Sequence, residues 1–313
     1  IISSNVLPMR WDDANAGRVS QAMAYMLYAE MVMYQKDTER YSKALGYMKE
    51  IISSGKYDLM PNYADIWKES GEWGIEAIFE VNYNDDNAQR DWGTPKSVGG
   101  TVLPTLCAPN QWPGGDGWDS GSDGWGFMPV RLETYEMYAE GDTRRDATCW
   151  DVRGVSYNER YQDTHIWLGK YRPYSDNCKD CPTSKNLNYN NNLRLYRFAE
   201  TLLNAAELLL QTGGSAGEAA QYVTRVRERA GLQGVASVTV NDIIEERHLE
   251  FVGEGKRYFD LVRSGLAATT LVPDKYGYRT NSWTENKKHI PLAQSELDAD
   301  PTLKPVSYTH LRA

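Results

Sequence analysis

Three tryptophans and three aspartates stand close together in the stretch QWPGGDGWDSGSDGWG, residues 111–126. The stretch also holds six glycines and has neither a helical nor a strand period. An indole on a glycine-rich loop is usually displayed to solvent or wedged beneath the loop, because no regular element orders it. The pattern therefore predicts either a ligand-binding surface or a packed loop.

A sugar ring would suit such a surface. One face of a pyranose consists of C–H groups that pack on an indole, while the hydroxyls at its rim need donors and acceptors. A further tryptophan, Trp92, stands near Asn87, Gln89 and Asp91. For each tryptophan that could stack on a sugar, packing beneath the loop remains the alternative. Trp125 is expected in the core. The predicted glycan-binding residues are Trp92, Asn110, Gln111, Trp112, Asp116, Trp118 and Asp119.

The same loop has two other chemical interpretations. Asp116, Asp119 and Asp123 could hold calcium, but the EF-hand spacing fails because no Glu closes the loop. Two carboxylates could hydrolyse a glycoside if one lay in an apolar pocket, which a loop sequence does not establish. HExxH, GxSxG and phosphate-binding glycine motifs are absent. We expect no enzyme and no cofactor, with calcium kept as an alternative.

Charged residues and histidines elsewhere are expected to be structural. The stretch EERHLEFVGEGKRYFD, residues 245–260, and the stretch EGDTRRDAT, residues 140–148, alternate opposite charges at short spacing. Such charges more often pair with each other than act as acids and bases. The isolated His165, His248 and His289 fit structural positions better than ligand or base positions.

Composition excludes several classes of protein. With 41% hydrophobic and 25% charged residues, the chain has the composition of a folded domain. Its net charge of −9 and the lack of a Lys/Arg-rich run argue against nucleic-acid binding. No apolar run approaches the ~18 residues of a membrane span.

The four cysteines are Cys107, Cys149, Cys178 and Cys181, and they form a single CxxC pair. A zinc site would want a second matched pair. Disulfides or thiols in an exported protein, unpaired buried thiols and a metal site all remain alternatives, and only an oxidising compartment agrees with the resemblance described below.

Two helices are predicted near the start of the chain. GRVSQAMAYMLYAEMVMYQ, from Gly17, and ERYSKALGYMKEIISSG, up to Gly55, place apolar residues at helical spacing. The short QKDT link makes them an antiparallel hairpin of tetratricopeptide length. One hairpin cannot bury its own apolar face, so further repeats are expected.

Further helices are predicted in the last third. LRLYRFAETLLNAAELLLQTGG, from residue 193, carries an apolar stripe, and Ser215 is expected to cap the helix after it. A third helix is expected to be capped by Asn241 or Asp242. A break near Gly253 and Gly255 and a short helix ending at Gly265 should follow. The stripe consists of Phe198, Leu202, Ala206 and Leu209.

The region between the helices is mostly irregular, with AIFEV, residues 77–81, as its clearest strand. Long irregular regions are usually functional. We expect an all-α-dominated, tetratricopeptide-like fold with a large irregular, loop-rich insert. The expected segments are a helical hairpin at 1–61, a ligand-binding region at 62–190 and a helical segment at 191–305.

Four stretches together resemble the SusD/RagB family of outer-membrane glycan-binding lipoproteins. They are GRVSQAMAYMLYAEMVMY, EGDTRRDAT, NLRLYRFAETLLNAAELL and EERHLEFVGEGKRYFDLVRSG. A fifth, HIPLAQSELDADPTLKP, is similar to the family's closing segment. The resemblance spans residues 17–305 and implies one SusD-like domain.

The departures from the family pattern are at the two ends. The resemblance implies a C-terminal fragment whose lipid anchor lies in an N-terminal region not present here, and which should be less stable than the full-length protein. VSYTHLRA, residues 306–313, replaces the family's tail and is interpreted as an assembly artefact.

The resemblance also implies a function. A SusD-like protein binds oligo- or polysaccharide at the cell surface without catalysis and delivers it to a SusC-like TonB-dependent outer-membrane transporter for nutrient uptake. Two alternatives stay open: a family member that binds peptide or glycoprotein, and a helical-repeat scaffold that only docks the transporter.

Overall fold

The computed structural model describes residues 2, 6–86, 89–94, 99–113, 124–178, 181, 184–277, 283–300 and 302–303. The chain divides into two units, Ile1–Arg257 and Tyr258–Ala313. The divisions expected from the sequence at 61/62 and 190/191 both fall inside the first unit and remain predictions.

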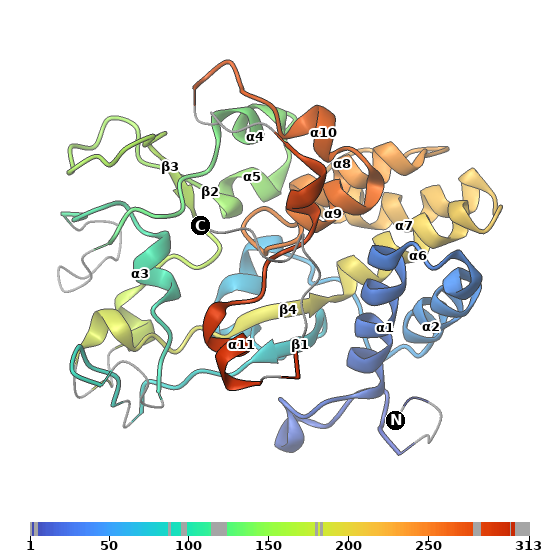
Figure 1. Ribbon diagram of the computed structural model, residues 1–313, viewed down its shortest axis with the longest axis horizontal. Helices are drawn as coiled ribbons and strands as arrows, with labels where there is room; N and C mark the ends of the chain where they lie inside the picture. Colours follow the sequence, from blue (N-terminus) through green and yellow to red (C-terminus); the bar gives the residue numbers. More distant parts are fainter. Residues whose placement is uncertain are drawn as a thin grey trace. The chain divides into compact units, whose positions relative to one another are not determined.

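Helical hairpins dominate the first unit, as predicted. The first hairpin consists of α1 (Gln21–Gln35) and α2 (Tyr41–Ser53), and the second of α6 (Phe198–Gln211) and α7 (Ala216–Arg229). Helix α2 packs against both α1 and α6, so hairpins far apart in the sequence lie side by side (Figure 1). Ser20 and the predicted Ser215 cap α1 and α7 by accepting backbone N–H bonds. This is the expected tetratricopeptide-like packing.

Helix α6 is the centre of this layer. All its residues from Phe198 to Leu209 are buried, because α2, α7 and α8 (Val240–Glu250) surround it. The four-residue stripe predicted from the sequence is therefore only part of its buried surface. A helix enclosed on all sides is typical of the core of a larger domain.

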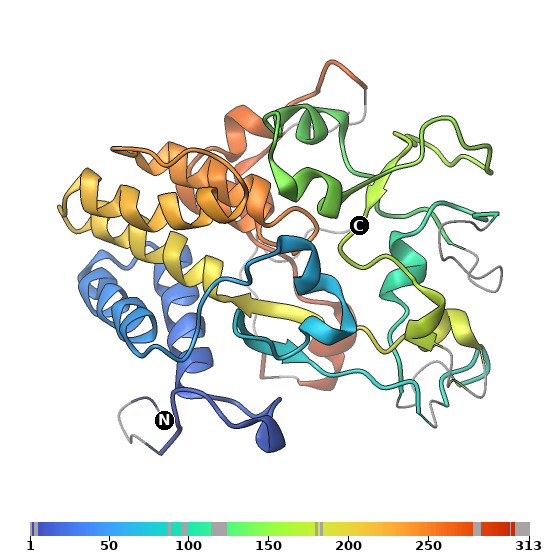
Figure 2. The same ribbon diagram turned by 180° about the vertical axis from the view of Figure 1, so that it is seen from behind.

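Two paired strands bring the beginning and the end of the irregular region together. The predicted strand is β1 (Ala77–Val81), and it pairs antiparallel with β4 (Leu193–Arg197). The expectation that LRLYR belongs to the following helix was wrong, because this segment is β4 and α6 begins directly after it (Figure 2). Pairing with β1 overrides the helical spacing of its apolar residues.

Short elements order much of the insert. They are α3 (Leu103–Cys107), α4 (Leu132–Met137), α5 (Thr143–Thr148), β2 (Cys149–Asp151) and β3 (Ile166–Leu168). Strands β2 and β3 pair antiparallel, and α5 packs against a short 3-10 helix, Tyr63–Trp67. A second apolar core lies among these elements, separate from that of the hairpins.

Buried ion pairs join the insert to the helices. Arg197 of β4 contacts Glu76 at 2.5 Å, Glu250 at 3.0 Å and Glu254 at 2.8 Å. Arg144 of α5 pairs with Glu250 and also with Asp142 and Glu246. These charges form structural pairs, as predicted, but they link different elements.

The charge around Glu250 sets its protonation. Burial favours the neutral acid, but Arg229, Arg197 and Arg144 together outweigh that effect and hold the pKa of Glu250 below its ordinary value. Arg229 contacts the same carboxylate at 2.5 Å. Glu250 is therefore ionised and satisfied inside the protein.

The start of α8 differs from the expectation, whereas its end agrees. Thr239 is the cap: its hydroxyl accepts the Asp242 N–H, and the Asp242 carboxylate accepts the Thr239 N–H. Asp242 thus stands three residues into a capping box. The helix ends at Glu250, and the predicted break follows at Gly253 and Gly255, whose φ values are +78° and +77°.

The second unit holds most of α9 (Arg257–Ser264), together with α10 (Ala267–Thr270) and α11 (Gln294–Ala299). Arg263 and Asp260 pair at 2.8 Å within α9, which ends at Ser264, directly before the predicted Gly265.

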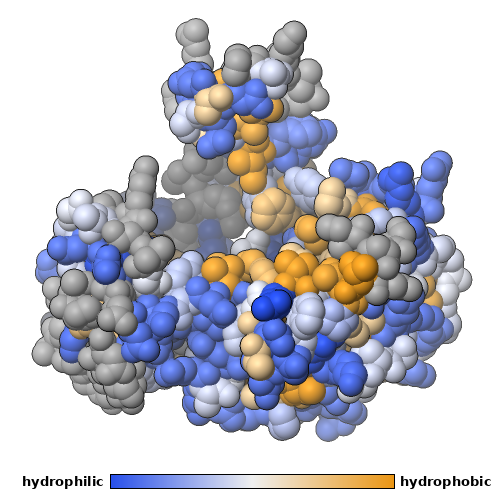
Figure 3. Space-filling view, turned by 90° about the horizontal axis from the view of Figure 1, so that it is seen from below, coloured by the Kyte–Doolittle hydropathy of each residue, from blue (hydrophilic) through white to orange (hydrophobic). Residues whose placement is uncertain are grey.

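Apolar side chains are visible on the face shown in Figure 3. Leu27 and Met31 of α1 are among the exposed large hydrophobic residues. Among the described residues, no helix has both the length and the apolar character of a membrane span.

Candidate functional site

Three aromatic side chains form an array on the insert: Trp92, Trp125 and Phe127. Trp125 contacts both neighbours, with its ring centroid 5.5 Å from that of Trp92 and 6.5 Å from that of Phe127. Trp92 is 63% exposed and Phe127 is 57% exposed, which is unusual for side chains of this size. The array therefore offers neighbouring aromatic surfaces to solvent.

Backbone hydrogen bonds hold Trp125 and Phe127, two of the three members of the array. The N–H groups of Trp125 and Phe127 donate to the carbonyls of Thr105 and Leu106 in α3. Gly126 between them has a φ of +65°, and a Cβ there would meet Asn110 and Arg160 at under 3 Å. Only glycine lets the chain pass this point and display an aromatic ring on either side of it.

The segment that carries Trp92 is held from residues 184–188. The Asp91 carboxylate accepts the Trp92 N–H at 2.8 Å and the Ser184 hydroxyl at 2.5 Å. These bonds, the one from Ser184 first, lower the pKa of Asp91 below its ordinary value. Asn188 donates to the carbonyls of Arg90 and Ser184 at 2.7 and 2.9 Å. Ser184 and Asn188 thus position an exposed tryptophan.

Polar groups surround the array. Arg160 stacks on Phe127, with its guanidinium carbon 4.6 Å from the ring centroid, and donates to the Trp125 carbonyl. Asn110 donates to the Asn158 carbonyl, and the Asn158 side chain donates to Gln111 at 2.9 Å. Aromatic faces with amide and guanidinium groups at their rim match the two needs of a sugar ring.

The sequence-predicted residues have different outcomes. Trp92, Asn110 and Gln111 lie in or beside this surface, and their role in binding stays a proposal. The expectation that Trp125 is a core residue was wrong, because its ring is half-buried against exposed Trp92. Asp116, Trp118 and Asp119 lie outside the described residues, as do Asn87 and the third aspartate of the calcium alternative.

Trp112 occupies the core instead of the surface. It is 6% exposed and meets Trp150 edge-to-face at 5.1 Å and Tyr157 at 5.7 Å. With its faces against other rings, Trp112 has no open face on which a sugar could stack. This side chain points inward because three aromatic residues, from β2, β3 and the segment between them, pack against it.

Phe127, Arg160, Ser184 and Asn188 were not predicted. No local pattern predicts Phe127, because Gly126 before it has a φ of +65° and the chain is not extended there. The contacts of Ser184 and Asn188 with residues 90–92 span more than ninety positions and leave no local pattern.

Two other chemistries find no support among the described residues. No group of three potential ligands that could hold a metal occurs there. All four cysteines are described, all are buried, and the structure forms no disulfide bond among them. Burial raises the pKa of the Cys149 thiol to about 12, so it is protonated at neutral pH.

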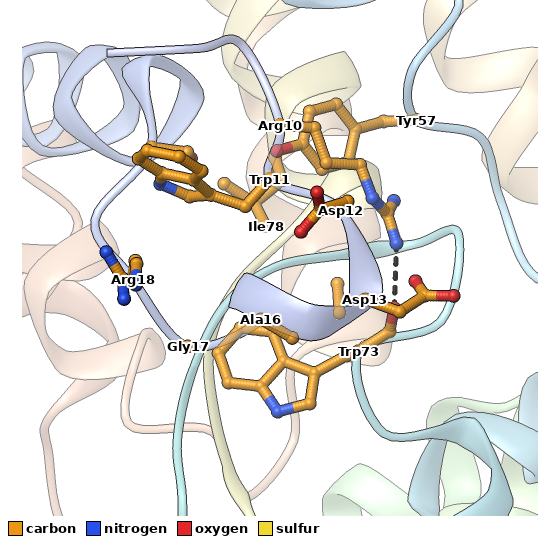
Figure 4. A pocket seen from close by; sticks show the side chains of 12 residues that line it. Arg10, Trp11, Asp12, Asp13, Ala16, Gly17, Arg18, Tyr57, Trp73 and Ile78 are labelled. Atoms are coloured by element: carbon orange, nitrogen blue, oxygen red, sulfur yellow. Dashed lines mark hydrogen bonds between the residues drawn. The ribbon is translucent and has the colours of Figure 1, made fainter.

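A small cavity lies near the start of the chain, beside Trp11 and Trp73. Arg10 reaches across it and donates to the Trp73 carbonyl at 2.7 Å (Figure 4). Its volume of about 30 Å³ holds one or two waters and excludes a sugar.

The fold is that of a helical-repeat protein with an exposed aromatic array, and comparison with known proteins gives its family. The SusD family matches residues 150–309, and the chain belongs to this family. A SusD-like protein of Formosa agariphila is 25% identical over 94% of this chain. The chain spans 59% of that relative's length.

Two solved structures are much more similar. Surface glycan-binding protein A from Bacteroides uniformis is 59% identical, with a TM-score of 0.87, over 98% of this chain and 66% of its own. Surface glycan-binding protein A from Bacteroides thetaiotaomicron, in complex with laminarihexaose, is 58% identical, with a TM-score of 0.88, over 95% of this chain and 66% of its own.

Proposed function

We propose that this chain binds a glucan of the laminarin type, without catalysis, on the array of Trp92, Trp125 and Phe127. The observation that carries the proposal is the exposure of Trp92 and Phe127, with their ring centroids 5.5 and 6.5 Å from that of the half-buried Trp125 between them. The choice of glucan follows the laminarihexaose bound by the relative from Bacteroides thetaiotaomicron.

An open array suits a polymer. Consecutive sugars of a chain can lie along adjacent aromatic rings, whereas a short saccharide contacts only one or two of them. If each stacked ring contributes ~1 kcal/mol, the three rings and a few hydrogen bonds give millimolar to micromolar affinity. Binding of this affinity is weak enough for the ligand to dissociate and pass to a second protein.

We further propose that this activity takes place at the cell surface, that it is held there by a lipid anchor at the outer membrane, and that the glycan passes to a SusC-like transporter. Family membership supports this placement. Weak, reversible binding on an open surface is compatible with transfer.

The test is calorimetry with laminarihexaose on wild-type protein and on Trp92→Ala and Trp125→Ala. Each substitution removes one stacked ring, so we expect affinity to fall ~5-fold or more for each. Trp11→Ala, a tryptophan outside the array, is the matched control and should bind as wild type. Unchanged affinity in both array variants, with intact folding, would contradict the proposal. Binding of extended peptides in preference to glucan would favour the peptide alternative.

A further inference from the structure

A larger cleft lies on the first unit, away from the array. Its volume is about 460 Å³, within the ~300–1,000 Å³ typical of small-molecule sites. It is bordered by the end of the 3-10 helix at Trp67, by α5 and β2, and by the turn at residues 169–174. We propose that this cleft is a second carbohydrate site, which takes a short neutral saccharide. Only the class of ligand rests on the proposed function.

Three aromatic side chains contribute to the lining, and only one of them is well exposed. Tyr174 is 42% exposed, and Trp67 and Trp150 line the cleft with small exposed edges. The Arg172 guanidinium carbon lies 4.1 Å from the Trp150 ring centroid and 5.5 Å from that of Tyr174. Arg172 is therefore stacked between two rings at the cleft wall with its Nε and Nη2 atoms buried, and Tyr174 adds an exposed phenol. This combination suits a ligand with C–H faces and hydroxyls.

The wall is fixed before any ligand arrives. In the turn that carries Arg172 and Tyr174, the preceding side chains point inward: Lys170 and Tyr171 are each 1% exposed. The Lys170 ammonium pairs with Glu254 at 2.6 Å and lies 4.7 Å from the Trp67 ring centroid. A preformed wall binds at lower entropic cost than a flexible one.

The charges of the lining cancel. Lys68 and Arg172 carry two positive charges, and Asp146 and Asp151 carry two negative ones. Lys68 also pairs with Asp65 at 2.7 Å, and Asp151 pairs with Arg153. An anion or a cation would therefore meet both signs of charge, whereas a neutral polyol can use the donors and the acceptors alike.

The cleft and the array are separate sites, since no described residue lines both. Trp112 is next to residues of both sites. It packs edge-to-face on Trp150 of the cleft, and in the sequence it follows Asn110 and Gln111, which lie beside the array. The cleft encloses a short saccharide, and the array accommodates a chain.

The test uses laminaribiose as the short probe and the Trp92→Ala background to weaken the array. Saturation-transfer NMR and calorimetry would compare Trp92→Ala with Trp92→Ala/Tyr174→Ala. We expect laminaribiose binding to persist in the first protein and to weaken at least 5-fold in the second. Tyr174→Phe should keep most of the affinity because the ring remains. Tyr161→Ala removes an 86% exposed tyrosine that does not line the cleft and should change nothing.

The outcomes separate this inference from the proposed function. Laminaribiose binding that is equal in both proteins, or absent from folded Trp92→Ala, would overturn the cleft. Laminarihexaose binding that survives Trp92→Ala and Trp125→Ala but is lost in Tyr174→Ala would overturn the array and keep the cleft. If neither saccharide binds wild-type protein, both proposals fail.

Discussion

At the residue scale, Asp91 connects an exposed tryptophan to the rest of the insert. Its carboxylate accepts bonds from Trp92 and from Ser184, so removing the Ser184 hydroxyl should free the Trp92 segment without opening a core. We expect Ser184→Ala to weaken laminarihexaose binding severalfold and to leave the melting temperature unchanged. Ser184→Thr should restore the bond and the affinity.

A spectroscopic signal distinguishes positioning from general structure in this test. Trp92 and Trp125 are close enough for their indole transitions to couple, so near-ultraviolet circular dichroism should report their arrangement. Ser184→Ala should reduce this signal and Ser184→Thr should retain it. If affinity falls while the signal stays as in wild type, Ser184 does not act through Trp92.

The sequence predicted which types of residue form this site better than it predicted whether each side chain points into the core or toward solvent. The polar residues around Trp92 suggested a surface position, and Trp92 is exposed, while its role in binding stays a proposal. Trp112 and Trp125 stand in the same glycine-rich stretch and have opposite outcomes, which depend on distant partners. Trp112 meets Trp150 and Tyr157, whereas backbone bonds to α3 leave Trp125 beside Trp92. No local pattern encodes those contacts.

At the element scale, Arg197 joins β4 to carboxylates that lie before β1, at the last residue of α8 and after α8. Replacing it with Ala would leave Glu76, Glu250 and Glu254 short of a positive charge inside the protein. Breaking a buried ion pair in this way typically costs about 3–5 kcal/mol. We expect Arg197→Ala to lower the free energy of unfolding by that amount in urea titrations.

Arg225 gives the matched control for this substitution. It pairs with Asp58 at 2.8 Å, but both side chains are well exposed. An exposed pair contributes about 0–1 kcal/mol, so Arg225→Ala should change the free energy of unfolding little. Equal losses in the two variants would contradict the importance assigned to the buried network.

The elements themselves were mostly predictable. Helices α1, α2 and α7 follow from apolar spacing and short polar links, and β1 follows from a β-branched and aromatic run. The strand β4 escaped prediction because LRLYR has apolar residues at spacings that suit either structure, and only pairing with β1 selects the strand. Local preference yields to long-range pairing at this position.

At the scale of the whole molecule, buried carboxylates predict how stability depends on pH. The folded protein lowers the pKa of Glu250 and of Glu254, since their cationic neighbours outweigh burial. Below the ordinary Glu value the unfolded chain binds more protons at these groups, so stability falls as pH falls.

Glu72 acts in the opposite direction. Burial, which outweighs its bond from Asn192 and the charge of Arg194, raises its pKa to about 7.

Because the folded protein binds the extra proton at Glu72, stability contributed by this group is lost as pH rises from the ordinary value through about 7. We therefore expect urea unfolding to show maximal stability at about pH 5. Glu72→Gln should reduce the decline above that pH, to which Glu80 also contributes because burial raises its pKa, and should keep the decline below it. A wild-type stability that rises steadily from pH 5 to pH 7.5 would contradict the role given to Glu72.

The ladder between β1 and β4 has a consequence for how such proteins diversify. Because the ladder brings residues 81 and 193 together, the segment between them leaves the helical layer and returns to almost the same place. The cost of closing such an excursion grows only slowly with its length, by about 0.6 kcal/mol per doubling. Evolution can therefore lengthen, shorten or replace the insert while the hairpins stay as they are. Ligand preference would then change by exchange of one closed module, with the repeats inherited intact.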